Sequence, residues 1–164
     1  MNSELEVGKS DNGRGLFAKK FFGRNQKVFE IRGKLIHHSV LMEKKKKIRN
    51  NTFRFSEEYY LSPEGNLGDF VNHSCSSNSK VKKIRSKLYI FSIKPVRKGE
   101  EILIDYSTIL ARDDFWVMKC KCGNKKCRHK IEKFSKLPKK VYKKYIDSKM
   151  IPDYIIRIKQ SDTH

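Results

Sequence analysis

The chain has 164 residues, with 38 Lys and Arg against 18 Asp and Glu and a formal net charge of +20 at pH 7. This length suits one domain with a modest core and a small appendage. No apolar run is long enough to cross a bilayer, and residues 1–10 lack the apolar stretch of a signal peptide. We therefore expect a protein of a reducing, soluble compartment with no membrane partner. The positive charge indicates either a solvated lysine-rich surface or attraction to nucleic acid or acidic protein.

The first part of the chain has the pattern of short strands separated by turns. The expected strands are residues 4–7, 15–18, 28–31 and 35–36, the last two as a pair interrupted at Gly33. The expected breaks are Asp11-Asn12-Gly13 and residues 21–26.

A short peripheral helix is expected next. Ser39 is a suitable cap for a helix that runs through Val40-Leu41-Met42 to Arg49. The basic run Lys44–Arg49 is either exposed helix or a nuclear-import patch.

Further short strands follow this helix. They are expected at residues 53–55, 59–61, 88–93 and 101–104, with turns at 63–66 and 95–99. Many strands and few helices predict a mainly β fold of several small mixed sheets with little parallel crossover.

The composition changes after Asp113, where cysteine and lysine dominate as far as Lys130. From Pro138 to Met150 the apolar residues return at helical spacing, and Pro152 is expected to end that helix. The sequence therefore divides into a main domain (1–112), a cysteine-rich segment (113–135) and a C-terminal helical extension (136–164).

The four cysteines favour one structural metal site. Cys120, Cys122 and Cys127 form the pattern C-x-C-x4-C, and Cys75 lies far upstream. Zinc prefers four tetrahedral ligands and binds thiolates well, so a fold that brings Cys75 to the other three completes a closed site. The alternative is four reduced thiols with no shared role.

Three segments combine with these cysteines: Gly13-Arg14-Gly15-Leu16-Phe17-Ala18, Asn72-His73-Ser74-Cys75, and Glu100 to Tyr106. In this order and spacing the chain resembles the SET-domain family of protein-lysine methyltransferases with a zinc-binding post-SET tail, in particular its small single-domain members from bacteria and viruses. The resemblance covers about residues 5–130. It implies a SET fold, in which several small sheets surround a knot-like core.

The resemblance also implies an activity and its residues. The chain would transfer a methyl group from S-adenosylmethionine to a lysine of a protein substrate, with Tyr106 as the catalytic residue. Asn72 and His73 would hold the cofactor, and one structural Zn²⁺ would bind to the four cysteines. The remaining cofactor-binding residues implied are Gly13, Arg14, Gly15, Tyr106 and either Trp116 or Phe115, as the aromatic cover of the adenine.

The chemistry of methyl transfer agrees with these residue types. The reaction needs a neutral amine aligned with the methyl group. An aromatic channel and the positive charge of the cofactor both disfavour the lysine ammonium, and a tyrosine hydroxyl can orient the amine. Four aromatic residues are candidates for channel walls or for ordinary core: Phe53, Phe55, Tyr59 and Tyr60.

The chain departs from the family pattern at four positions. Asp69 and Ser77 stand where arginine and proline are frequent, and neither is an expected ligand. Phe53 falls where many members have another active-site tyrosine, which either slows catalysis or leaves Tyr59 or Tyr60 to substitute. Ile104 replaces an aromatic residue two positions before Tyr106, which permits multiple methylation.

Two other classes of function stay open. A weakly catalytic SET fold with this charge would serve as a DNA- or chromatin-binding adaptor, and a zinc-stabilised nucleic-acid binder would need no cofactor. For the enzyme, the resemblance suggests histone tails as substrate. A basic enzyme gains nothing from long-range attraction to a basic tail, so either the peptide groove is locally acidic, or DNA, a nucleosome or an acidic partner brings the substrate close. The expected location is nucleus or chromatin for a eukaryotic, viral or host-delivered protein, and cytoplasm for a prokaryotic one.

Overall fold

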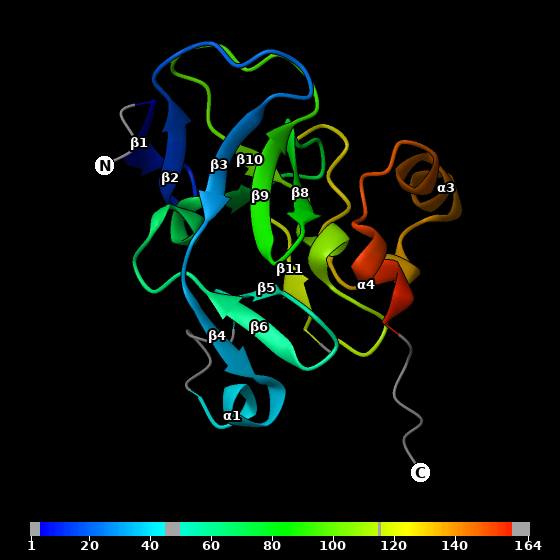
Figure 1. The fold of residues 1–164 in the computed structure, drawn as a ribbon. Coiled ribbons are helices and arrows are strands. Elements are labelled where there is room, and N and C mark those ends of the chain that lie inside the picture. Colours follow the sequence, from blue (N-terminus) through cyan, green and yellow to red (C-terminus); the bar gives the residue numbers. More distant parts are fainter. Residues whose placement is uncertain (1–3, 45–49, 115, 159–164) are drawn as a thin grey trace.

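The computed structural model describes residues 4–44, 50–114 and 116–158 (Figure 1). As predicted, this part of the chain is mainly β, with short strands in small sheets and few short helices. None of its helices is both long and apolar enough to cross a bilayer.

The chain begins with a hairpin of β1 (Leu5–Ser10) and β2 (Gly13–Ala18), which pair antiparallel with Ser10 opposite Gly13. Only two residues make the turn, and Gly13 supplies the positive φ of 102° that follows it. Both strands are longer than predicted because pairing extends to the turn.

Two three-stranded sheets form most of the fold. One has the order β3 (Lys27–Ile31), β9 (Lys87–Ser92), β8 (Ser79–Ile84), and the other the order β4 (Lys34–His37), β6 (Tyr59–Ser62), β5 (Phe53–Arg54). The expected strands on either side of Gly33 are therefore present but lie in different sheets. A Cβ at Gly33 would lie 2.0 Å from the carbonyl oxygen of Ser62, so only glycine allows this crossing.

The helix expected near residue 40 is shorter than predicted. It is α1 (His38–Met42), and its N-cap is His37 rather than Ser39, because the His37 side chain accepts a hydrogen bond from the backbone N–H of Ser39. Glu43 is its C-cap. Residues 45–49, which contain most of the basic run, lie outside the described residues.

Two small strand pairs lie close to the functional residues. The strands β7 (Asn72–His73) and β10 (Leu103–Ile104) pair in parallel, and β11 (Met118–Lys119) pairs antiparallel with β12 (Lys130–Ile131). Three short 3-10 helices complete this region, η1 (Leu67–Phe70), η2 (Tyr106–Ile109) and η3 (Phe134–Lys136). The β7–β10 pair brings the Asn72–Cys75 segment beside the residues before Tyr106, as the family resemblance implied.

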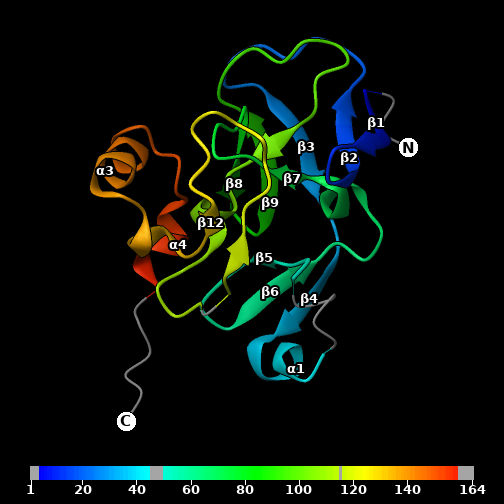
Figure 2. The ribbon, with the colours of Figure 1, turned by 180° about the vertical axis from the view of Figure 1, so that it is seen from behind.

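The C-terminal extension packs a second apolar cluster on the main core. The predicted helix is α3 (Lys139–Asp147), with Pro138 as its N-cap. A further helix, α4 (Asp153–Arg157), was not predicted, because Pro152 stands at its N-cap as well as beyond the end of α3. Both helices lie on the side of the molecule near β8 (Figures 1 and 2). The buried residues of this cluster are Ala111, Phe134, Leu137, Tyr145, Met150, Ile151, Ile155 and Ile158.

Arg54 joins β5 to the start of the cysteine-rich segment. Its side chain is 1% exposed and its guanidinium donates to both carboxylate oxygens of Asp113, at 3.1 and 2.7 Å. The same group donates to the hydroxyl of Tyr60 at 2.6 Å, and that hydroxyl donates to Asp114 at 2.7 Å. The planar guanidinium thus satisfies a buried polar cluster that a single ammonium cannot reproduce.

Arg54→Lys should destabilise the protein by about 1–3 kcal/mol, because a single ammonium cannot donate to Asp113, Asp114 and the Tyr60 hydroxyl together and so leaves part-buried acceptors unpaired. Chemical denaturation of the variant measures this loss. The matched control is Arg32→Lys, since the Arg32 side chain is 75% exposed and 3.9 Å from Glu30, and it should change the free energy of unfolding by less than about 0.5 kcal/mol. Equal effects of the two substitutions would show that the buried cluster contributes no special stability.

Candidate functional site

An aromatic-lined cavity of about 60 Å³ opens beside Tyr106. This volume exceeds the roughly 10–15 Å³ that one water needs and suits a narrow chain. Of the four aromatic residues considered as channel walls, Phe53 and Tyr60 line the cavity, whereas Phe55 and Tyr59 do not. The lining residues are Asn50, Asn51, Thr52, Phe53, Arg54, Tyr60, Gly68, Val71, Tyr106, Ile109, Leu110 and Trp116.

Tyr106 is held at this wall by two hydrogen bonds. Its hydroxyl donates to the carbonyl oxygen of Val71 at 2.7 Å, and its backbone N–H donates to Nδ1 of His73 at 3.1 Å. Burial, and then the negative charge of Glu101, raise the pKa of Tyr106. The side chain is therefore a neutral phenol at pH 7, and its oxygen lone pairs remain available as acceptors.

Trp116 lines the same cavity, with its ring centroid 6.2 Å from that of Tyr106. Its indole N–H donates to Oδ1 of Asn50 at 2.7 Å, which ties the cysteine-rich segment to the residues before β5. Phe115, the other candidate for an aromatic cover, lies outside the described residues.

The glycine turn meets β7 through Asn72. The Asn72 amide donates to the backbone oxygen of Arg14 at 2.9 Å and to the carboxylate of Glu101 at 2.7 Å. A Cβ on Gly15 would overlap that carboxylate, so a larger residue at position 15 would displace Glu101 from Asn72. Sequence reasoning counted Glu101 only among acids that could make a peptide groove locally acidic, because nothing local shows that a carboxylate at position 101 reaches the hairpin.

His73 connects this region to the thiols. Burial is the largest influence on its ring and lowers its pKa to about 4, although the charge of Asp105 acts in the opposite direction. The imidazole is therefore neutral at pH 7. Because Nδ1 accepts from the Tyr106 N–H, the ring proton must sit on Nε2. Nε2 lies 3.3 Å from Sγ of Cys75 and can donate to it.

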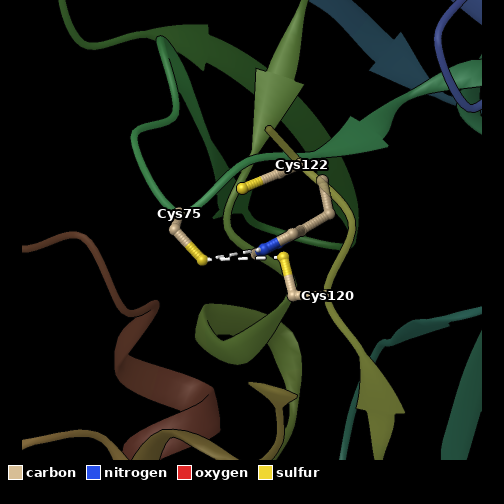
Figure 3. Close-up of side chains that lie close together, drawn as sticks. Cys75, Cys120 and Cys122 are labelled. Atoms are coloured by element: carbon tan, nitrogen blue, oxygen red, sulfur yellow. Dashed lines mark hydrogen bonds between the residues drawn. The ribbon is translucent and has the colours of Figure 1, made fainter. Parts of the chain in front are cut away.

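Three of the four cysteines meet at one point, as Figure 3 shows for Cys75, Cys120 and Cys122. Their sulfur atoms and a ring nitrogen of His73 all lie within 4.8 Å of one another. The Sγ atoms of Cys75 and Cys120 are 3.8 Å apart. Four thiolates at about 2.3 Å from a zinc ion lie about 3.8 Å from each other in a tetrahedron, so the geometry fits a metal.

Cys127, the fourth predicted ligand, is not a member of that tight group. It packs in the same small cluster with Cys122 and the buried Ile131, and it interacts with the thiols of Cys120 and Cys122. Its sulfur accepts from the backbone N–H of His129 at 3.3 Å.

The thiols differ in how readily they ionise. Burial raises the pKa of Cys75 to about 11 and raises that of Cys120 further. For Cys122, burial is outweighed by hydrogen bonds from the backbone of Cys75 and Asn124 and from the other thiols, which lower its pKa to about 7. A divalent ion deprotonates coordinating thiols outright.

Asp105 links this cluster to the rest of the protein. Its carboxylate is fully buried and accepts two hydrogen bonds from the guanidinium of Arg128, both at 2.7 Å. It also accepts from the hydroxyl of Tyr145 in α3 at 2.8 Å. The backbone N–H of Arg128 in turn points at Sγ of Cys75 at 3.4 Å. The structure thus gives Asp105 a positioning role and no contact with the cavity.

The departures from the family pattern have clear places. The Tyr60 hydroxyl is engaged by Arg54 and Asp114, so it does not replace the tyrosine missing at Phe53. Ile104 is fully buried in the main core and does not line the cavity. Asp69 accepts from the backbone N–H of Gly65 in the turn before β7, and Ser77 is buried.

Comparison with characterised proteins places these residues in a known family. A family model described as the SET domain matches residues 13–107, which is more than half of the chain. Histone-lysine N-methyltransferase 2B of Homo sapiens is 32% identical over 129 residues, which cover 71% of this chain and 5% of that protein. An H3 lysine-4 specific histone-lysine N-methyltransferase of Schizosaccharomyces pombe is 30% identical over 126 residues, 70% of this chain and 13% of that protein.

A solved structure agrees with the sequence relatives. Polycomb Repressive Complex 2 of Chaetomium thermophilum, bound to GSK126, matches with a TM-score of 0.58 and 26% identity over 64% of this chain and 16% of that chain. The present chain spans only a small part of the length of each of these relatives. The family model, the shared sequence and the shared fold together show that the chain belongs to the SET-domain family.

Proposed function

We propose that the chain is a protein-lysine N-methyltransferase that uses S-adenosylmethionine, as its family membership implies. The observation that carries the proposal is the position of Tyr106 at the wall of an aromatic-lined cavity, with its hydroxyl held by the Val71 carbonyl and its backbone N–H by His73.

The charge of the cavity suits a lysine amine next to a cationic cofactor. Although the chain carries a net charge of +20, Arg54 is the one cationic side chain among the described lining residues, and Asp113 and Asp114 neutralise it. Tyr106 and the Val71 carbonyl add acceptor oxygens. A sulfonium held beside this cavity would disfavour a second positive charge inside it, so a lysine would enter as its free base.

The chain's own groups would bind and orient the reactants. The backbone of Gly13, Arg14 and Gly15, with Asn72 and His73, would hold the methionine part of the cofactor, and Trp116 would cover the adenine. When bound, S-adenosylmethionine supplies an electrophilic methyl group to an attacking amine. The Tyr106 oxygen accepts a hydrogen bond from the amine and orients its lone pair, while the aromatic walls exclude water.

We propose one structural zinc held by Cys75, Cys120, Cys122 and Cys127. The proximity of His73 raises a second ligand set, in which its imidazole replaces Cys127. The hydrogen bonds of His73 favour the four-cysteine set, because the backbone of Tyr106 occupies Nδ1 and the proton on Nε2 faces Cys75. A metal ligand needs a free nitrogen lone pair, which this ring does not offer.

We propose histones as the substrate class and chromatin as the place of action, since the relatives are named for histone lysines. A basic histone tail gains no long-range attraction from a basic enzyme. Contact between the enzyme and DNA would remove this difficulty, because the enzyme and the histone would then be bound to the same polyanion.

Tyr106→Phe should lower the rate of methyl transfer to histone H3 by about 100-fold or more, because the oriented oxygen is lost. The thermal midpoint and zinc content should stay close to the parent's, since the lost bond to Val71 contributes about 1 kcal/mol. Transfer of a labelled methyl group measures the rate. Tyr89→Phe, on β9 and away from the cavity, is the control. Parent-like transfer by Tyr106→Phe would remove Tyr106 from the mechanism.

Elemental analysis distinguishes the two ligand sets. The purified protein should contain about one zinc per chain, and Cys127→Ser should lose it. His73→Asn should retain the zinc if the four cysteines bind it. The asparagine oxygen can still accept the hydrogen bond from the Tyr106 N–H, but no atom takes the place of Nε2 as a metal ligand. The opposite pattern, zinc lost from His73→Asn and kept by Cys127→Ser, would establish histidine as the fourth ligand.

A further inference from the structure

One face of the protein gathers cations with few acids among them. Residues 79–87, from the start of β8 to the first residue of β9, contain five Lys and Arg and no Asp or Glu. This strand lies beside the C-terminal extension, where α3 and α4 are on the same side of the molecule in both views (Figures 1 and 2).

A groove separates β8 from the segment that contains α4. Five cationic side chains line it, and Asp153 is the one carboxylate among the described lining residues. The lining residues are Lys80, Val81, Lys82, Lys83, Lys149, Ile151, Pro152, Asp153, Tyr154 and Arg157.

The fold holds the ammonium group of Lys80 close to two other lysines of the groove. Lys80 Nζ donates to the backbone oxygen of Lys149 at 2.8 Å, which fixes its ammonium near the side chains of Lys82 and Lys149. Burial, followed by the charges of those two lysines, lowers the pKa of Lys80. Lys83 is directed inward, over the rings of Phe55 at 3.9 Å and Tyr154 at 5.0 Å. Like charges held together in this way are stabilised by a bound anion.

A second basic hollow adjoins the groove. Four lysines of α3, Lys139, Lys140, Lys143 and Lys144, line it together with Asp147 and Ser148. The opposite side of α3 packs Val141, Tyr145 and Ile146 on the C-terminal cluster, so the lysines face solvent. Ser148 borders one hollow and Lys149 the other, so the two hollows meet at adjacent residues of the chain, and we call them together the basic face.

We propose that the basic face binds the phosphate backbone of double-stranded DNA without reading its sequence. Lysines are flexible point charges that suit phosphates, and contacts to phosphates position a protein on a duplex without carrying sequence information. A duplex carries one charge per about 1.7 Å of its axis, so a surface of two adjoining hollows meets phosphates in any register. Such a surface exceeds what one small anion fills, and the charge density of a duplex fits it better than an acidic peptide does.

This inference deepens the proposed function, since it supplies the contact that brings a basic enzyme to chromatin, but DNA binding itself needs no methyl transfer. The test therefore measures binding of a fluorescent duplex by anisotropy, without cofactor, over a range of salt concentrations. Methyl transfer to free histone H3 is assayed separately, so the two proposals can fail independently.

The test variant is Lys82→Gln/Lys143→Gln/Lys149→Gln, which removes three exposed charges from the basic face. The control is Lys19→Gln/Lys34→Gln/Lys98→Gln, which removes the same net charge from exposed positions just after β2, in β4 and in the turn before β10. At about 100 mM salt the test variant should bind roughly tenfold more weakly or worse. The plot of log affinity against log salt should become shallower, with the magnitude of its negative slope reduced by about two to three.

The control should stay within about threefold of the parent, because phosphate contacts rather than net charge determine the affinity. Equal weakening of both variants would overturn the proposal by showing that total charge alone attracts the duplex. Absence of binding at low salt, or tighter binding of a poly-glutamate peptide of equal charge, would also overturn it.

Discussion

The fully buried carboxylate of Asp105 fixes three segments of the chain relative to one another. It accepts hydrogen bonds from both terminal nitrogens of Arg128, in the cysteine-rich segment, and from the hydroxyl of Tyr145, in α3. The third segment is η2, because Asp105 directly precedes Tyr106. A buried ion pair is strongly destabilising to break, because the charge left behind has no water to replace its partner. The extension and the thiol cluster are therefore fixed relative to the residue proposed to perform the chemistry.

One histidine links the thiol cluster to Tyr106 in the cavity wall. His73 accepts from the backbone of Tyr106 on one side of its ring and faces Cys75 on the other. The parallel pairing of β7 with β10 makes this possible, because it sets Ile104 opposite His73 and so places the start of η2 beside the ring. A change at the thiol cluster would thus be transmitted to Tyr106 through one ring, so the proposed zinc would also support the position of Tyr106.

The sequence predicted the elements whose pattern is local. The hairpin around Gly13, the strand of Leu88 and Ile90 and the helix of Tyr145 all follow from spacing and turn residues. It did not predict β8, whose alternating lysines conceal the buried Val81. Contacts between distant residues were also missed where no motif marked them: Glu101 reaches Asn72, and Arg54 reaches Asp113. Cysteine spacing predicted the meeting of Cys75 with Cys120 and Cys122, but not the competing position of His73.

Hydrogen exchange of an Asp105→Asn variant tests most directly whether the Asp105 carboxylate holds the cysteine-rich segment and α3 in place. Amides of residues 118–131 and of α3 should lose protection together, because Arg128 keeps a buried charge without its partner and Tyr145 loses a charged acceptor. The comparison is Glu132→Gln, which removes a carboxylate paired with the half-exposed Lys130 and should leave both segments protected. Unchanged exchange in α3 and in the cysteine-rich segment of Asp105→Asn would contradict the account.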